Sequence, residues 1–420
     1  MKKRLKILIS AYACSPYKGS EPGVGWGFVA ELAKHHDLWV MVEEEKFRED
    51  IERYLADNPG FADNVHFYFI RKQRNRRLRK LWPPSYYWYY RRWHQKAVGL
   101  GKKLHREIGF DVAHQLTMVG FREPGYLWQL GIPFVWGPVG GMGFFPWRFL
   151  PMLDLKGATY YLAYNLFNWR QMRFSSRPKK AALIAGSGLI AATPENQLGA
   201  ARYWGNVGAQ LMSEVGLPPV QAVEPYRREP GQPLQIVWTG LHLPRKALDL
   251  ALEALAKLPS HHHWHLQVLG KGERTDSWQQ LASQLDIDDK VTFHGWLQRD
   301  QAMHVMQKSH VMLITSLRDL TSTVTIEALA QGLPIVCLDH CGFAGVVNED
   351  CGIKVPVISP KVAINGIRDA VARLEADEPL RRQLALGAMQ RARDFSWESK
   401  VENLNRIYAD VIAAQGSDAR

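Results

Sequence analysis

Two acidic residues, Asp319 and Glu327, stand eight residues apart in the stretch SLRDLTSTVTIEALAQG, which spans residues 316–332. A strand is expected before this stretch and a helix inside it, so Asp319 belongs to the loop and Glu327 to the first turns of the helix. The two carboxylates can therefore lie on either side of one ligand and accept hydrogen bonds from its sugar and ribose hydroxyls. The spacing leaves an alternative open, in which Asp319 is an ordinary loop residue and Glu327 only complements the helix dipole.

A run of hydroxyl residues, Thr321, Ser322 and Thr323, stands where this helix should begin. Serine and threonine favour the position before the first helical turn, because their side chains can accept hydrogen bonds from free backbone N–H groups. The same N–H groups and the positive end of the helix dipole attract phosphate groups. The stretch therefore predicts a diphosphate-binding site at the start of a helix.

Alternating strands and helices are expected to position this stretch in the second half of the chain. The expected strands there are Leu234–Thr239, His265–Leu269, Val291–His294, Val311–Thr315 and Pro334–Leu338. The expected helices there are Ala247–Leu258, Trp278–Leu285, Gln301–Lys308 and Thr323–Gln331. A last amphipathic helix is expected at about 397–414, since apolar residues recur there near the 3.6-residue period.

The first half of the chain shows the same alternation. The expected strands are Lys6–Ala13, Leu38–Val42, Val65–Ile70, Val112–His114, Pro133–Trp136 and Leu183–Ala192. The expected helices are Gly25–His35 and Pro194–Trp204. Such alternation is typical of a parallel sheet with helices on both faces.

We therefore predict an α/β protein with two Rossmann-like domains that face each other across a cleft, where ligands of open α/β sheets bind. The predicted first domain spans residues 1–216, and a proline-rich and charged linker spans 217–233. The predicted second domain spans 234–396. The predicted C-terminal helix, 397–420, packs back toward the first domain.

Composition excludes some classes of protein. The 420 residues have 46% hydrophobic and 22% charged residues, which is ordinary for a globular protein, and no apolar run is long enough to span a bilayer. The N-terminal MKKRLKILISAYAC could be a signal peptide, but a buried strand explains it better. The four cysteines show no zinc-type spacing, so we expect reduced, buried thiols and a cytoplasmic protein.

Three further patterns favour ordinary surface or packing roles. The acids Asp286, Asp288 and Asp289 match a metal-binding D-x-D pattern, but they lie between an expected helix and strand, where a solvated turn is the better interpretation. A histidine run (His261, His262, His263, His265) lies in another loop, with no carboxylate partner expected nearby. The glycines between Gly23 and Gly27 lack the spacing of a dinucleotide-binding loop.

The stretch at 316–332 with its continuation TIEALAQGLPIVCLDHCGFAGVV resembles the E-x7-E signature of the retaining glycosyltransferases of family 4, with aspartate in place of the first glutamate. VWTGLHLPRKALDLALEALAKLP, LQVLGKGE and VTFHGWLQRDQ resemble earlier strands and loops of that family, and KILISAYACSPYKGSEPGVGWGFVAELAK resembles its first strand, glycine loop and helix. The resemblance is strong from about 234 to 350 and weaker in the first half. It implies the GT-B fold.

The resemblance also implies roles for individual residues. Lys246, with Arg245 beside it, matches the lysine that holds the donor diphosphate, and Glu327 matches the glutamate that binds the ribose. Asp319 matches the sugar-binding glutamate. The remaining donor-binding residues that it implies are Gly23, Gly25, Gly240, His242, Thr321, Ser322 and Thr323, with the glycines allowing close backbone approach.

Two positions depart from the family pattern. Leu241 stands where the family has an arginine after glycine, so Arg245 or His242 would have to supply that positive charge. The family often has a histidine after the strand that reads PFVWGPVGG here, and this chain has Trp136 and Gly137 instead. His114 at an earlier strand end is one candidate for that role, and a hydrogen-bonded loop histidine is the alternative.

The formal net charge of +12 is concentrated in one segment. Residues 71–106 contain thirteen Lys or Arg, no Asp or Glu, and seven Trp or Tyr. Aromatic rings settle at the headgroup level of a bilayer and arginines are attracted to anionic lipid. We therefore expect a membrane-binding or acceptor-binding patch, and its residues are Arg74, Arg76, Arg77, Arg79, Trp82 and Trp88. The alternative is a solvated basic face whose aromatic residues turn into the core.

These observations together predict sugar transfer from a nucleoside-diphosphate sugar to a hydroxyl acceptor, with Asp319, Lys246 and Arg245 as the catalytic residues. The resemblance implies retention of the anomeric configuration and a lipid-linked or glycan-precursor acceptor. No metal or other cofactor is expected, and the enzyme is predicted to bind the inner face of the membrane. The alternatives are a nucleotide-sugar 2-epimerase of the same fold and, ranked lower, a basic protein that binds nucleic acid.

Overall fold

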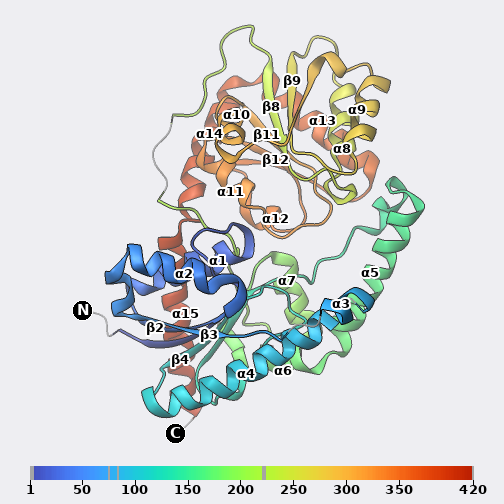
Figure 1. Cartoon of the computed structure of the whole chain (residues 1–420). Coiled ribbons are helices and arrows are strands. Elements are labelled where there is room, and N and C mark those ends of the chain that lie inside the picture. The colour runs from blue at the N-terminus through green and yellow to red at the C-terminus, as the bar shows by residue number, and fades with distance from the viewer. Residues whose placement is uncertain (1–3, 74–75, 83–84, 220–223, 419–420) are drawn as a thin grey trace. The chain divides into compact units, whose positions relative to one another are not determined.

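The computed structural model describes residues 4–73, 76–82, 85–219 and 224–418. Contacts within the chain group it into two compact units (Figure 1). The first unit contains residues 1–142, 169–216 and 397–420, and the second contains 143–168 and 217–396. The chain therefore passes between the units more than once.

The first unit is built on a seven-stranded parallel sheet with the order β3-β2-β1-β4-β5-β6-β7. Its strands are β1 (Lys6–Ala11), β2 (Asp37–Glu43), β3 (Val65–Ile70), β4 (Val112–Thr117), β5 (Phe134–Val139), β6 (Leu189–Ala191) and β7 (Gln210–Leu211). All six residues of β4 and of β5 are buried, as expected for strands covered on both faces. The order β3-β2-β1-β4-β5-β6 is the Rossmann strand order.

The helices of this unit surround its sheet. They are α1 (Ser20–Ala33), α2 (Glu44–Asp57), α3 (Arg76–Leu81), α4 (Ser85–Ile108), α6 (Ser176–Ala185), α7 (Pro194–Gly199) and α15 (Trp397–Asp418). Thr193 caps α7 by accepting a hydrogen bond from the backbone N–H of Asn196, and Pro194 is the first helical residue.

Two element predictions in this half were wrong. The strand predicted from Leu183 to Ala192 is only three residues long, because the alanine-rich run before Gly186 forms the end of α6. The helix predicted from Gly25 begins at Ser20 instead. Glycine inside a helix weakens a prediction based on propensity, but Gly25 is used here for close packing: a Cβ atom at this position would lie 2.2 Å from the carbonyl oxygen of Ala13.

The second unit has a six-stranded parallel sheet with the order β10-β9-β8-β11-β12-β13, which is again the Rossmann order. Its strands are β8 (Leu234–Thr239), β9 (Trp264–Leu269), β10 (Val291–Gly295), β11 (Val311–Ile314), β12 (Ile335–Leu338) and β13 (Gly352–Val355). Its helices are α8 (Leu248–Ala256), α9 (Thr275–Gln284), α10 (Arg299–Gln307), α11 (Thr323–Ala330), α12 (Phe343–Val346), α13 (Pro360–Ala376) and α14 (Glu378–Arg393). The prediction of two Rossmann-like domains is confirmed.

Residues 143–168 differ from the predicted domain boundaries, because they belong to the second unit and not to the first. Phe145, Phe149 and Tyr161 are buried in one core with β8 and α8. Helix α5 (Leu155–Phe174) follows, so it begins in the second unit and ends in the first. We call residues 143–168 the excursion of the chain into the second unit. No local sequence pattern predicts it, because the partners of these aromatic residues lie about 100 residues further along the chain.

The predicted linker, 217–233, is also part of the second unit. Arg228 donates hydrogen bonds to the backbone carbonyl of Glu375 at 2.6 Å and to its Oε1 at 2.7 Å. The side chains of both residues are largely buried. Arg228 of this segment is therefore packed on the second unit.

Helix α15 packs on the first unit. Val401, Leu404 and Tyr408 are buried, and the Tyr408 hydroxyl lies 2.7 Å from Nδ1 of His114 on β4. The Trp397 ring at the start of α15 fills the space beside Gly27, where a Cβ atom would lie 2.3 Å from the ring. Among the described residues, no helix combines the length and the apolarity that crossing a bilayer requires.

Candidate active site

The loop from β11 to α11 and the loop after β8 are joined by several hydrogen bonds. The Leu317 backbone N–H donates to the carbonyl of Arg245 at 2.8 Å, and the Thr315 hydroxyl donates to the carbonyl of Lys246 at 2.8 Å. Thr315 in turn accepts a hydrogen bond from the indole N–H of Trp238 on β8. The predicted diphosphate-binding site and the predicted basic loop therefore lie together in the second unit.

The three predicted catalytic residues form one cluster between these loops. The ammonium group of Lys246 donates to Oδ2 of Asp319 at 2.5 Å, and Nη1 of Arg245 lies 3.6 Å from the same oxygen. Arg245 also donates to the carbonyl of Arg318 at 2.8 Å. All three side chains are only partly exposed, so each charge is partly shielded from water but still accessible to a ligand.

Helix α11 begins next to this cluster. Ser322 has extended backbone angles and is its cap residue, and Thr323 is its first residue. Thr321 is buried and close to Gly342, since a Cβ atom at Gly342 would lie 2.4 Å from the Thr321 hydroxyl. The backbone therefore has the form that presents N–H groups of the first turn to an anion.

Glu327 lies on α11, and its carboxylate forms an ion pair with Arg299, the first residue of α10. The Glu327 side chain is 15% exposed and the Arg299 side chain is 75% exposed. Arg299 was not predicted as a site residue. Its only sequence signal is its place directly after the loop that follows β10.

His242 lies in the loop after β8, and its part in donor binding stays a prediction. The ring is buried between Trp238 and Trp278, and its Nδ1 lies 2.8 Å from the Thr275 hydroxyl. Burial lowers its pKa below the ordinary value. The contact with Thr275 joins the loop after β8 to the start of α9.

Close backbone packing shapes the same loop. A Cβ atom at Gly240 would meet nothing closer than 3.6 Å, so this glycine is not required by space. Gly270, at the end of β9, has φ +108°, and a Cβ atom there would lie 2.0 Å from the carbonyl oxygen of Gly240. Gly270 is therefore the residue that lets the ends of β8 and β9 approach each other, and sequence reasoning missed it.

A second arginine, Arg318, lies beside Arg245 and was also missed. Its guanidinium stacks over the ring of Tyr164 on α5, 3.8 Å from the ring centre. Burial raises the pKa of the neighbouring Tyr161, and the charges of Arg245 and Arg318 partly offset that rise. The excursion at 143–168 therefore brings two tyrosines to the basic cluster.

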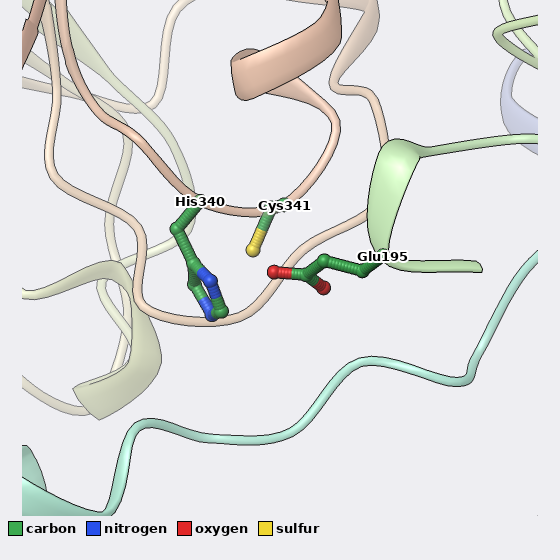
Figure 2. Close-up of side chains that lie close together, drawn as sticks. All are labelled: Glu195, His340 and Cys341. Atoms are coloured by element: carbon green, nitrogen blue, oxygen red, sulfur yellow. The ribbon is translucent and has the colours of Figure 1, made fainter. Parts of the chain in front are cut away.

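The loop after β12 contacts the backbone of Asp319. The backbone N–H of Asp319 donates to Sγ of Cys341 at 3.2 Å. Figure 2 shows His340 and Cys341 next to each other on this loop. Cys341 is buried, as are Cys14, Cys337 and Cys351.

The first-unit glycines of the predicted donor site lie on α1. A Cβ atom at Gly23 would lie 2.8 Å from the carbonyl oxygen of Lys18, and the clash at Gly25 is stronger. Both glycines thus serve the packing of α1 against the loop after β1. Their part in donor binding stays a prediction.

Some side chains of the basic segment, residues 71–106, are buried and others are exposed. Tyr90 and Trp93 on α4 are buried, whereas Trp82 and Trp88 are about half exposed and Arg77 is exposed. Arg74 and the side chains of Arg76 and Arg79 lie outside the described residues. We call the described exposed part, Arg77, Lys80, Leu81, Trp82, Tyr87 and Trp88, the α3–α4 patch.

The structure also places the D-x-D acids, the histidine run and His114. Asp286, Asp288 and Asp289 are exposed in the turn before β10. The histidine run was expected to lack a carboxylate partner, which was wrong, because Nδ1 of His262 lies 2.7 Å from Oε2 of Glu375 on α13. His114 is fully buried within β4 between Tyr408 and the carbonyl of Gly137, and burial lowers its pKa to about 4. It is therefore a structural histidine and not a loop residue.

Residues 225–391 match the sequence model of the family described as glycosyl transferases group 1. The second unit carries a glycosyl transferases group 1 domain. The match includes Arg245, Lys246, Asp319 and Glu327, so the whole basic cluster and both acids lie inside this domain.

Curated relatives of the chain are named glycosyltransferases. The D-inositol 3-phosphate glycosyltransferase of Corynebacterium glutamicum (strain R) is 26% identical over 212 residues, which are 47% of this chain and 49% of that protein. The chain therefore spans about half the length of the curated relatives it matches.

Solved glycosyltransferase structures share the fold of the whole chain. Sucrose-phosphate synthase from Thermosynechococcus elongatus aligns with a TM-score of 0.60 at 16% identity, covering 98% of this chain and 100% of that one. HepE of Anabaena in complex with UDP-glucose aligns with a TM-score of 0.56 at 14% identity, covering 99% and 100%. The predicted resemblance is thus confirmed for the group 1 domain and for the fold.

Proposed function

We propose that this protein transfers a sugar from a nucleoside-diphosphate sugar to a hydroxyl acceptor. The observation that carries this proposal is the Lys246–Asp319–Arg245 cluster beside the start of α11, inside a group 1 domain. A related fold binds UDP-glucose in HepE, which supports the same class of donor here.

The chemistry follows from the charges of the cluster. As the bond from the sugar to the diphosphate breaks, negative charge develops on the leaving phosphate oxygen. The Lys246 ammonium, the Arg245 guanidinium and the N–H groups at Ser322 and Thr323 would stabilise that charge. Asp319 would then exchange its contact with Lys246 for a sugar hydroxyl, and Glu327 would accept from the ribose.

We further propose that the reaction retains the anomeric configuration and needs no divalent metal. The support for the second point is that two cations, Lys246 and Arg245, lie next to Asp319 and could balance the charge of a diphosphate in place of a metal ion. Retention is what the resemblance to family 4 implies. We expect chelation by EDTA to leave the initial rate unchanged. Complete inhibition that added metal reverses would contradict this part of the proposal.

We also propose that the acceptor is a lipid-linked or glycan precursor and that the protein binds the inner face of a membrane. The support is the α3–α4 patch, in which the exposed cations Arg77 and Lys80 are followed along the chain by exposed aromatic rings. Nucleic acid is not an expected partner.

The test is a product assay. The purified protein is incubated with a panel of UDP- and GDP-sugars, with and without a lipid extract, and release of nucleoside diphosphate is followed. We expect release to depend on the extract and the sugar to appear on a new product. An isomerised sugar without an acceptor would indicate an epimerase instead.

A further inference from the structure

Helix α5 buries two asparagines and exposes several large apolar residues. The stripe that faces the protein is formed by Tyr161, Asn165, Asn168 and Met172, all buried. Asn165 accepts a hydrogen bond from the backbone N–H of Phe145 at 3.0 Å and donates one to its carbonyl at 2.8 Å. The inner face is therefore fixed by hydrogen bonds to backbone groups, in addition to ring packing.

The outward side of the same helix is rich in large apolar groups. Leu166, Phe167 and Phe174 have between 52% and 62% of their surface exposed, and Tyr160, Leu162 and Trp169 have between 42% and 60%. Single exposed apolar residues are ordinary, but a contiguous group along one helix indicates that something covers it. We call the exposed residues Tyr160, Leu162, Leu166, Phe167, Trp169, Arg170, Arg173 and Phe174 the α5 outer face.

The charged residues in and around this face are all basic. Residues 155–194 contain Lys156, Arg170, Arg173, Arg177, Lys179 and Lys180, and no Asp or Glu. Arg170 and Arg173 lie over the ring of Phe174, at 5.9 and 5.6 Å from its centre. Cations whose stems lie on apolar surface, with Trp and Tyr beside them, suit the interface of an anionic bilayer.

We propose that the α5 outer face binds an anionic lipid bilayer, with the helix lying in the plane of the headgroups. This surface consists of other residues than the α3–α4 patch and does not depend on the proposed sugar transfer. The apolar side chains would enter the boundary of headgroups and acyl chains, while Arg170 and Arg173 reach lipid phosphates. The length and apolarity of α5 do not suffice to cross a bilayer, so a position in the interface is the one open to it.

The experiment measures co-sedimentation of the full chain with vesicles of phosphatidylcholine and phosphatidylglycerol, and with phosphatidylcholine alone. Leu166→Ser/Phe167→Ser tests the apolar part, and Arg170→Gln/Arg173→Gln tests the charged part. Leu386→Ser on α14 is the matched control, since Leu386 is 59% exposed on a helix outside α5. Trp82→Ser/Trp88→Ser gives the separate contribution of the α3–α4 patch.

We expect the protein to bind only the anionic vesicles, and each α5 double variant to bind at least about tenfold more weakly. The Leu386→Ser protein should bind like the wild type, and melting temperatures should be unchanged because all these side chains are exposed. Wild-type binding by the α5 variants would overturn the proposal. So would a wild-type protein that ignores vesicles but self-associates through this face, which would assign the face to a second copy.

A fluorescent label gives a second readout. The four native cysteines are buried, so Phe167→Cys can be labelled selectively with an environment-sensitive dye, with Leu386→Cys as its control. Anionic vesicles should shift the emission of the label at position 167 to the blue and leave that at 386 unchanged. Equal responses at the two positions would contradict the proposal. None of these readouts uses nucleotide or sugar, so failure here is distinguishable from failure of the proposed function.

Discussion

At the scale of single residues, the site depends on how the charge of Asp319 is shared. Its Oδ2 receives the Lys246 ammonium at 2.5 Å and has the Arg245 guanidinium at 3.6 Å. The Cys341 thiol and the Asp319 backbone fix the loop from the other side. A diphosphate donor bound as proposed would therefore compete with Asp319 for the same cations.

We predict that Asp319→Ala and Glu327→Ala reduce sugar transfer by roughly 10- to 100-fold while the protein stays folded. Each variant removes a hydrogen bond between a charged group and the donor, and such a bond contributes about 1.5–3 kcal/mol. Initial rates and melting curves measure the two effects. Asp286→Ala is the control, because this acid is exposed in a turn before β10. Unchanged turnover in Glu327→Ala would remove Glu327 from the donor site.

A second residue-scale prediction concerns Arg318. Leu241 stands where the resembling family has an arginine. Arg318 accepts a hydrogen bond from Arg245 through its backbone carbonyl, and we predict that its guanidinium supplies positive charge to the site. Tyr164→Leu removes the ring under the Arg318 guanidinium, whereas Tyr164→Phe keeps it. We expect Tyr164→Leu to weaken binding of a nucleoside diphosphate several-fold and Tyr164→Phe to have no effect. Equal affinity in both variants would show that this stacking does not support the site.

At the scale of elements, the packing of α1 requires a glycine at position 25. Gly25→Ala would bring a Cβ atom to 2.2 Å from the carbonyl oxygen of Ala13, so α1 would have to move away from β1. We expect a loss of about 1–3 kcal/mol of unfolding free energy, as for other overpacked sites. Gly19→Ala is the matched control, since nothing lies within 4 Å of a Cβ atom there. Equal melting temperatures for the two variants would contradict this account of α1.

The elements themselves were largely predictable where the chain is locally regular. All five strands predicted for the second half are present, because buried parallel strands are short apolar runs bounded by turns. The excursion at 143–168, the Arg299–Glu327 ion pair and the His262–Glu375 contact were not predictable. Each joins residues that are far apart in the sequence, and neither periodicity nor composition specifies such partners.

At the scale of the whole molecule, buried histidines couple stability to pH. Burial lowers the pKa of His114 to about 4, of His310 to about 4 and of His94 to about 3. In the unfolded chain these residues titrate near 6.5, so between about pH 6.5 and 4 the unfolded chain binds more protons than the folded one. Their contribution to stability is therefore complete above about pH 6.5 and is lost as pH falls toward 4.

We predict a lower melting temperature at pH 5 than at pH 7, with about 2 kcal/mol less unfolding free energy for each of these histidines. His114→Gln should make the dependence on pH shallower, whereas His263→Gln should not, because His263 is exposed. Thermal melts across this range measure both. A His114→Gln protein with the wild-type pH dependence would show that His114 is not a source of the effect.

The central claim is that the basic cluster of the second unit holds the diphosphate of a nucleotide-sugar donor. Calorimetric titration of the wild type and of Lys246→Met with UDP, GDP and the corresponding nucleosides tests it most directly. We predict that the wild type binds one nucleoside diphosphate and that Lys246→Met binds it at least about tenfold more weakly, as expected for a lost charged hydrogen bond. Binding of the nucleoside alone should be the same in both proteins. A wild type that binds neither diphosphate, or a Lys246→Met protein that binds like the wild type, would contradict the claim.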